Sequence, residues 1–313
     1  MKVKSLLIAF TLASLLLSCE RVLVIPRDYK AENIIVIVMD GPRYSETWGD
    51  VTHQNIPHLY NDIAKQGVVY TGFYNNGPTY TLSGHTSITT GYYQEINNSG
   101  QEPPIYPSFF QYWMISGRKN KDSAWIIASK DKIEILKNCK NIRYKDRGVP
   151  STNCGINGIN TGYRDDSITF KTVIKTLTNY QPKLLLINLK EPDNLAHKGN
   201  WSNYLKGIKQ SDEYIFQIWN YIQSSPFYKD KTALFITNDH GRHLDGVAGG
   251  FSNHGDGCDG CRRLFLCAVG PDFKSGTTIT TRRELIDITA TIAEILHLQM
   301  NYSNGKIMYE LFK

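Results

Sequence analysis

Short apolar runs alternate with amphipathic stretches along the chain. Because the apolar runs do not alternate with polar residues, they predict strands buried on both faces of a parallel sheet. They cover residues 33–39, 68–74, 123–128, 184–189, 233–237 and 264–269. Helical periodicity is clearest over 202–223, where Ser202 is the expected N-cap, and further helices are predicted at 56–66, 108–116, 167–179 and 283–296. This order predicts an α/β fold, a three-layer αβα sandwich with a mostly parallel central sheet.

The first residues have the pattern of an export signal. Two lysines precede an apolar run that is short for a membrane-spanning helix, and a small residue precedes Cys19. Residues 16–19 resemble a bacterial lipobox, so we expect residues 1–18 to be removed and Cys19 to carry a lipid anchor. An uncleaved anchor helix or an ordinary signal is the alternative. The expected location is the bacterial cell envelope, in the periplasm or on the outer membrane.

Composition and charge narrow the class of protein. The chain has 313 residues, of which 41% are hydrophobic and 20% charged, which excludes a disordered protein. We see no linker that would divide two domains, so a tether at 19–30 and one domain at 31–313 are expected.

The net charge of +6 is spread along the chain without a basic block. Nucleic-acid binding is therefore not indicated, although a mild attraction for anionic ligands is.

The six cysteines are too few for a disulfide framework and are interpreted individually. Beyond the candidate anchor, Cys258 and Cys261 form a CxxC motif without a second pair, which argues against a structural zinc site. A disulfide between them is the favoured interpretation in an oxidising compartment, and Cys139 and Cys154 could close another loop. Cys267 lies in an apolar run and is expected to be a buried thiol.

Acidic residues follow three of the predicted strands. Asp40 follows the first, Asp193 follows the strand at 184–189, and Asp239 follows the strand at 233–237. Sheets of this type build their sites at the carboxyl ends of the strands. A single aspartate there is usually a turn residue, but these occur with three histidines: His197, His240 and His254. Carboxylate and imidazole are ligands of zinc and related metals, so the set is sufficient for two ions.

A hydroxyl-rich segment at 78–91 supplies a candidate nucleophile. A turn that leads into a helix could direct a hydroxyl at a metal and place backbone N–H groups where an anion binds. The segment contains Thr79, Thr81 and Ser83, which are rival candidates on the sequence pattern alone. Taken alone, the segment is more typical of a threonine-rich turn and helix cap than of a catalytic site.

Five short motifs occur in the order found in one enzyme superfamily. They are MDG with Asp40, TLSGH from Thr81 to His85, the pair Asp193 and His197, DHG with Asp239 and His240, and then His254. The chain thereby resembles the alkaline phosphatase superfamily, and most of all its nucleotide pyrophosphatase/phosphodiesterase branch, over residues 36–271. The resemblance implies an alkaline-phosphatase-like fold and two divalent metal ions, with zinc expected.

The resemblance also assigns roles to individual residues. It implies one metal on Asp193, His197 and His254, and a second on Asp40, Thr81, Asp239 and His240. Thr81 would attack the phosphorus of a small phosphate ester and form a phospho-threonine intermediate. Asn98, or less favourably Asn97, would donate to the phosphoryl oxygen.

Departures from the branch pattern leave several activities open. The branch usually has TFPNH where this chain has TLSGH, and no arginine stands at a clear phosphate-clamping position, although Arg43 or Arg242 could serve. Hydrolysis of phosphodiester or nucleotide pyrophosphate bonds is the leading expectation. A phosphomonoesterase and a phosphoryl or phosphoethanolamine-type transferase are the alternatives. A sulfatase is disfavoured because no Cys or Ser is followed by the expected Pro and Arg, and an inactive metal-binding protein is the least favoured. Residues 130–165 are the expected contributor to selectivity.

Overall fold

The computed structural model describes residues 27–117 and 119–313. The predicted signal at 1–18, the candidate anchor Cys19 and most of the predicted tether lie outside these ranges. Within the described ranges, no helix combines the length and the hydropathy that crossing a membrane requires.

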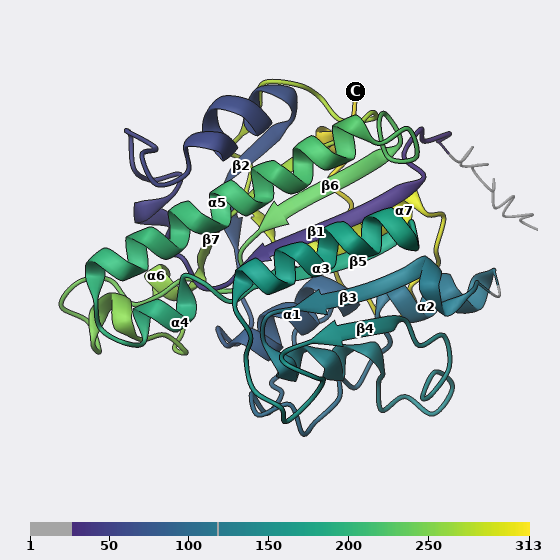
Figure 1. Ribbon diagram of the computed structural model, residues 1–313, viewed down its shortest axis with the longest axis horizontal. Helices are drawn as coiled ribbons and strands as arrows, with labels where there is room; N and C mark the ends of the chain where they lie inside the picture. The colour runs from purple at the N-terminus through teal and green to yellow at the C-terminus, as the bar shows by residue number, and fades with distance from the viewer. Residues whose placement is uncertain (1–26, 118) are drawn as a thin grey trace, which may run out of the picture.

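One nine-stranded sheet forms the middle layer of the molecule (Figure 1). Its strand order is β4-β3-β5-β1-β6-β7-β2-β8, with β9 also paired to β2. Strand β7 is antiparallel to both β6 and β2, whereas the other pairings are parallel, which confirms a mostly parallel sheet. The strands are β1 (Asn33–Met39), β2 (Val68–Tyr74), β3 (Ala124–Ala128), β4 (Ser151–Cys154), β5 (Leu184–Leu189), β6 (Thr232–Thr237), β7 (Arg263–Val269), β8 (Thr277–Ile279) and β9 (Arg283–Glu284).

Helices cover both faces of this sheet. Helices α3 (Asp166–Asn179) and α5 (Trp201–Ser224) pack on one face, in front of the sheet in Figure 1. Helices α1 (Thr81–Thr90), α2 (Phe109–Ser116) and α7 (Asp287–Ile295) pack on the other. The short helices α4 (Asp193–Ala196) and α6 (Asp259–Arg262) lie in loops at the end of the sheet that carries the candidate site. The predicted three-layer sandwich is therefore confirmed.

The apolar runs lack alternation because both faces of each central strand are buried. In β1, Ile34 and Val36 belong to the core on the α1 side, whereas Ile35 and Ile37 belong to the core on the α3 and α5 side. All four side chains are fully buried. Successive side chains of a strand point to opposite faces, so a strand between two helical layers needs an apolar residue at every position.

Three helix predictions need correction. The N-cap of α5 is Asn200, whose side chain accepts a hydrogen bond from the Asn203 N–H at 2.9 Å, and not Ser202. The predicted helix at 56–66 contains a π-helical segment, Leu59–Ile63, followed by a 3₁₀ turn. The helix predicted to begin at residue 283 begins at Asp287, because Arg283 and Glu284 instead form strand β9, which pairs with β2.

The expected disulfides are absent from the described part of the chain. All five cysteines described there are free thiols. Cys154 is buried at the end of β4 with its Sγ against the Ile126 carbonyl, whereas the Cys139 Sγ lies near the carbonyl of its own loop residue Asn141. The two thiols therefore have separate environments. Cys267 is fully buried in β7, as predicted.

Candidate active site

The strand order brings the predicted acidic residues to one edge of the sheet. Strand β1 lies between β5 and β6 and is parallel to both, so the residues that follow these three strands meet. Asp40 follows β1, Asp193 begins helix α4 just after β5, and Asp239 and His240 follow β6. His254 reaches the same place from the long loop that precedes α6.

The first group of candidate ligands consists of Asp40, Asp239 and His240. All three are completely buried, and each offers one ligand atom within 4.8 Å of the others. The His240 Nδ1–H donates to the Gly241 carbonyl at 2.9 Å, which leaves a lone pair on Nε2. That nitrogen, Asp40 Oδ1 and Asp239 Oδ2 are buried without a hydrogen-bond partner in the described residues. Unpartnered buried acceptors are costly, and a cation at their centre would satisfy all three.

The second group consists of Asp193, His197 and His254, again within 4.8 Å of one another. Asp193 Oδ1 lies 3.2 Å from His197 Nε2 and 3.4 Å from His254 Nε2. The Nδ1–H of His254 donates to the Thr79 carbonyl at 2.8 Å, which directs its Nε2 toward the group. Burial lowers the pKa of His254 to about 2, so its imidazole is neutral. Neutral imidazoles and a carboxylate are suitable metal ligands.

Thr81 is the first residue of α1 and is almost completely buried. Its Oγ1 accepts a hydrogen bond from Lys130 Nζ at 3.1 Å. Asn98 Oδ1 accepts from the Leu82 N–H at 3.0 Å and so holds the start of the same helix. Asn97 is exposed, and its side chain accepts from the Ser99 N–H within its own loop. The structure therefore brings Asn98, rather than Asn97, next to the candidate nucleophile.

The two rival hydroxyls have different surroundings. Thr79 Oγ1 donates to the Asp256 carbonyl at 2.7 Å and is already engaged. Ser83 lies inside α1, fully buried, and its Oγ has no hydrogen-bond partner among the described residues. Neither hydroxyl forms the contact with Lys130 that Thr81 has.

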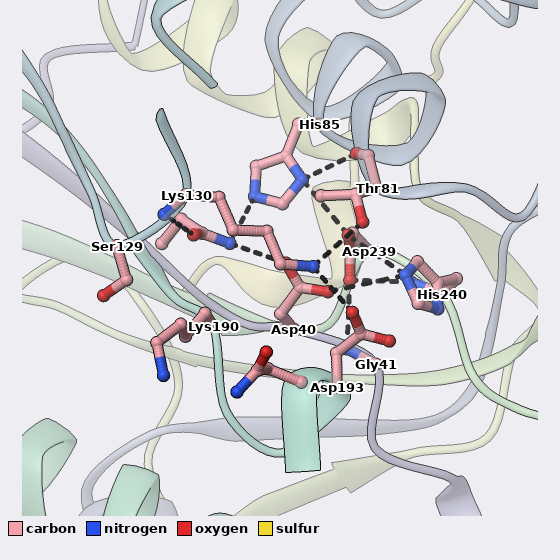
Figure 2. Close-up of polar contacts among 12 residues, drawn as sticks. Asp40, Gly41, Thr81, His85, Ser129, Lys130, Lys190, Asp193, Asp239 and His240 are labelled. Atoms are coloured by element: carbon pink, nitrogen blue, oxygen red, sulfur yellow. Dashed lines mark hydrogen bonds and ion pairs between the residues drawn. The ribbon is translucent and has the colours of Figure 1, made fainter. Parts of the chain in front are cut away.

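Lys130 is a central residue that the sequence analysis missed. It follows β3, which lies beside β5, and its Nζ is 2.9 Å from Asp40 Oδ2 and 2.7 Å from Asp193 Oδ2 (Figure 2). The ammonium group thus joins one carboxylate of each ligand group and the Thr81 hydroxyl. Burial alone would raise the pKa of Asp40 and of Asp193, but Lys130 holds both well below their usual range. The available signal was a charged residue two positions after the end of a fourth strand.

Arg242 is a second buried cation at the site. It is completely buried, its Nη1 forms an ion pair with Asp193, and its Nη2 donates to the Ser252 carbonyl at 3.0 Å. Arg43, the other arginine considered from the sequence, instead pairs with Glu46 and Asp245. Only Arg242 of these two therefore lies among the candidate ligands.

His85 and Asn188 support the ligands from behind. The Nδ1–H of His85 donates to the Thr81 carbonyl at 2.8 Å, and this nitrogen also lies 3.2 Å from Asp239 Oδ2. The Asn188 amide donates to Asp40 Oδ2 at 2.9 Å and to His85 Nε2 at 3.2 Å. Hydrogen bonds of this type orient metal-binding side chains. The motif that contains Thr81 is thereby connected to both aspartates of the first group.

The fold and the paired ligand groups define a class of metal-dependent enzymes. The chain belongs to the metalloenzyme superfamily, whose family model matches residues 126–300. Membership of this superfamily implies divalent metal ions.

Sequence comparison finds two bacterial phosphopentomutases. The one from Caldanaerobacter subterraneus subsp. tengcongensis is 26% identical over 155 residues, which cover 49% of this chain and 35% of the relative. The one from Herpetosiphon aurantiacus is 27% identical over 148 residues, covering 47% of this chain and 34% of the relative. The chain thus spans about a third of the length of these curated relatives.

Solved structures share the fold. Murine ectonucleotide pyrophosphatase/phosphodiesterase 5, an inactive threonine-to-alanine variant in complex with AMP, superposes with a TM-score of 0.64 at 14% identity, covering 90% of this chain and 100% of that one. A phosphonate monoester hydrolase from Silicibacter pomeroyi has a TM-score of 0.60 at 14% identity, covering 88% and 76%. A member of the alkaline phosphatase superfamily from Vibrio parahaemolyticus has a TM-score of 0.64 at 11% identity, covering 90% and 70%. These solved structures confirm the alkaline-phosphatase-like fold, and the family model places the chain in the metalloenzyme superfamily.

Proposed function

We propose that the protein is a metal-dependent phosphoesterase that cleaves phosphodiester or nucleotide pyrophosphate bonds of small molecules, with Thr81 as its nucleophile. The observation that carries this proposal is the position of the Thr81 hydroxyl. It lies at the start of α1, 3.1 Å from the ammonium group that joins Asp40 of one ligand group to Asp193 of the other. A nucleophile beside two ligand groups suits an in-line displacement at phosphorus, because two bound ions would stabilise the attacking and the leaving oxygen.

The donor atoms fit two divalent ions. Asp40, Asp239 and His240 would hold one ion together with the Thr81 oxygen, and the second group of ligands would hold the other. We propose zinc for both, because imidazole nitrogen and carboxylate oxygen are its usual ligands in catalytic sites. When bound, the ions supply a lowered pKa for the nucleophile and positive charge for the phosphoryl group.

The residues of the chain then perform a two-step displacement. Thr81 Oγ1 loses its proton to solvent and forms a bond to phosphorus, while the bond from phosphorus to the leaving oxygen breaks and the leaving oxygen takes up a proton from solvent. Water next attacks the phosphorus of phospho-threonine, breaks the bond to Thr81 and restores its hydroxyl. Asp193 and Asp40 raise the pKa of Lys130 above its usual value against the effect of burial, so this side chain stays protonated. Lys130 therefore acts as a hydrogen-bond donor to the Thr81 oxygen and as a positive charge, and not as the base.

Substrate assays with matched variants test this proposal. We expect the purified, zinc-loaded protein to hydrolyse an aryl phosphodiester faster than the corresponding monoester or sulfate ester. Thr81→Ala should lower kcat by at least about 10³-fold, since the nucleophile is removed. Thr178→Ala, on the exposed face of α3, is the matched control and should retain full activity. Full activity in Thr81→Ala would contradict the assignment of the nucleophile.

A second candidate function is phosphoryl transfer to an acceptor other than water. The two sequence relatives are phosphopentomutases, and Lys130 and Arg242 supply two buried positive charges that suit a phosphomonoester dianion. The two candidates differ in what accepts the phosphoryl group. Product analysis with a phosphomonoester and a sugar alcohol acceptor separates them: a transferase forms a new phosphate ester, whereas a hydrolase releases inorganic phosphate.

We further propose that the enzyme is lipid-anchored through Cys19 in the periplasm or on the outer membrane of a bacterium. The lipobox-like residues 16–19 support this location. Cys19→Ala should move the protein from the membrane fraction to the soluble fraction and abolish labelling with a radioactive fatty acid. Unchanged membrane association of this variant would contradict a lipid anchor.

A further inference from the structure

A third group of metal-ligating side chains lies outside the candidate active site. His243, Asp256, Cys258 and Cys261 each offer one ligand atom, and these atoms all lie within 4.8 Å of one another. His243 and Cys261 are buried, Cys258 is half-buried and Asp256 is exposed. None of the four belongs to the two ligand groups described above. They come from the loop that follows β6 and from helix α6, at the end of the molecule where α4 also lies (Figure 1).

The histidine of this group is oriented for metal binding. The His243 Nδ1–H donates to the Ala248 carbonyl at 2.9 Å, which leaves the lone pair on Nε2. That Nε2 is buried, has no hydrogen-bond partner among the described residues, and lies 3.2 Å from Asp256 Oδ1. Two acceptors that face each other at this distance need a proton or a cation between them. In a tetrahedral zinc site, nitrogen and oxygen ligands are about 3.4 Å apart, which matches the observed separation.

The two cysteines have the spacing of a zinc-binding pair. Cys258 is the N-cap residue of α6 and Cys261 lies inside this helix, so the CxxC motif turns both thiols toward the same point. Both are free thiols. The Cys258 N–H donates to Asp256 Oδ1 at 3.0 Å, which fixes the carboxylate beside the thiols. The second pair of ligands that the sequence lacked is therefore supplied by a histidine and an aspartate rather than by two further cysteines.

We propose that His243, Asp256, Cys258 and Cys261 bind a structural zinc ion. Two thiolates, one carboxylate and one neutral imidazole complete a four-coordinate site without an open position, as structural zinc sites require. Binding displaces the two thiol protons to solvent and involves no oxidation or reduction. Two thiolates and a carboxylate leave a net charge of −1 on the zinc complex. The Arg262 guanidinium lies where a side chain on Gly257 would be placed, beside the segment that carries Asp256 and Cys258, and its positive charge would favour this net charge.

The zinc ion would hold the loop that carries part of the active site. The Gly241 N–H donates to the Cys261 carbonyl at 2.7 Å, and the His243 N–H donates to the Asn253 carbonyl at 3.0 Å. Between these connections the loop contributes Arg242 and His254 to the contacts of Asp193. By coordinating His243 near the start of this loop and the two cysteines at its end, the ion would hold the two ends together. It would thereby keep His254 in position. The binding of zinc itself does not depend on the function proposed for Thr81.

Cobalt substitution tests the site directly. Thiolate bound to Co²⁺ gives a charge-transfer absorption band, and the two catalytic groups contain no cysteine, so this band reports on the third site alone. The wild-type protein, purified with a reductant and loaded with Co²⁺, should show the band. Cys258→Ser and Cys261→Ser should lose it together with one equivalent of bound metal. Cys267→Ala, a thiol in β7, and Asp193→Asn, a ligand of the catalytic groups, should retain the band.

Several results would overturn the proposal, and two of them need only the wild-type protein. Absence of the band in cobalt-loaded wild-type protein is one. A Cys258–Cys261 disulfide, found by mass spectrometry in protein isolated from the cell envelope without reductant, is another. Equal metal content in wild type and Cys258→Ser is the third. Protection of Cys258 from alkylation by added zinc, reversed by a chelator, would support the site even if the serine variants fail to fold.

Discussion

Replacing Lys130 by methionine provides a sharp test of the active-site electrostatics. The substitution preserves most of the side-chain volume but removes the ammonium group that lies 2.9 Å from Asp40 and 2.7 Å from Asp193. In the metal-free protein, two buried carboxylates then face each other without their main counter-charge. Zinc loading would restore positive charge, so the cost of the substitution should depend on the metal.

The magnitude follows from the two short ion pairs. At an effective dielectric constant of about 20, each pair contributes a Coulomb energy of about 6 kcal/mol. Removing the lysine from water offsets much of this gain, and breaking a buried pair typically costs about 3–5 kcal/mol. We therefore expect Lys130→Met to lower the free energy of unfolding of the metal-free protein by about 3–5 kcal/mol at pH 7, and by less than about 2 kcal/mol with zinc bound.

The pH dependence has a definite sign. In wild type, Lys130 holds the pKa values of Asp40 and Asp193 below their usual range, so these carboxylates stay ionised and do not change its stability from pH 7 down to the ordinary carboxylate pKa of about 4. In Lys130→Met the two buried carboxyls take up protons more readily, which relieves their charge as the pH falls. The difference in stability between wild type and variant should consequently narrow between pH 7 and pH 4.

Urea denaturation with and without zinc measures these differences. Lys137→Met is the matched control, because Lys137 forms a 2.7 Å ion pair with Glu134 but is partly exposed, where such pairs contribute less than about 1 kcal/mol. If Lys130→Met lowers the free energy of unfolding of the metal-free protein by less than about 1 kcal/mol, the buried ion pairs of Lys130 do not stabilise the protein as argued. If the free energy of unfolding falls equally with and without zinc, the charge of Lys130 does not substitute for that of metal ions bound by the two ligand groups.

Three further predictions use other parts of the site. A Cβ atom on Gly84 would lie 2.5 Å from the Asp239 carbonyl oxygen, so Gly84→Ala should displace α1 and lower kcat at least about 10-fold in steady-state assays. Burial and Lys130 lower the pKa of Lys132 to about 8, so the metal-free protein should gain stability as the pH rises from 8 to 10. Denaturation of Lys132→Met should show a smaller rise. Chelation of the metals should abolish activity and lower Tm, and zinc should restore both; activity that survives complete chelation, verified by metal analysis, would contradict a metal-dependent mechanism.

The sheet was predictable because its sequence signal is local. Apolar runs such as residues 33–39 and 184–189 have no polar position, and a strand covered by helices on both faces needs this pattern. Helix ends were less predictable, since several polar residues compete for each cap. Asn200 and Ser202 are both acceptable N-cap residues, and only the folded backbone shows that Asn200 receives the N–H of Asn203.

The candidate ligands could also be predicted from the sequence, because their positions follow from those of the predicted strands. Asp40, Asp193 and Asp239 directly follow predicted strands, and parallel neighbouring strands bring their carboxyl ends together. Lys130 also follows a strand, but its contact with two carboxylates requires β3 to lie beside β5, and this strand order is not encoded in any single motif. The position of Arg242 likewise depends on the path of the loop after β6.

The CxxC motif is a second case in which the sequence does not show which residues come together. From spacing alone, Cys258 and Cys261 lack a second pair of zinc ligands. The loop after β6 folds back so that His243 and Asp256 come beside them, across separations along the chain that match no common motif. The sequence by itself therefore determined the layers, the strands and the residue types that gather at their ends, because these follow from local hydrophobic pattern and chain order. Which side chains share a site, and with what counter-charge, was decided by strand order and loop paths, because these arise only when distant segments pack together.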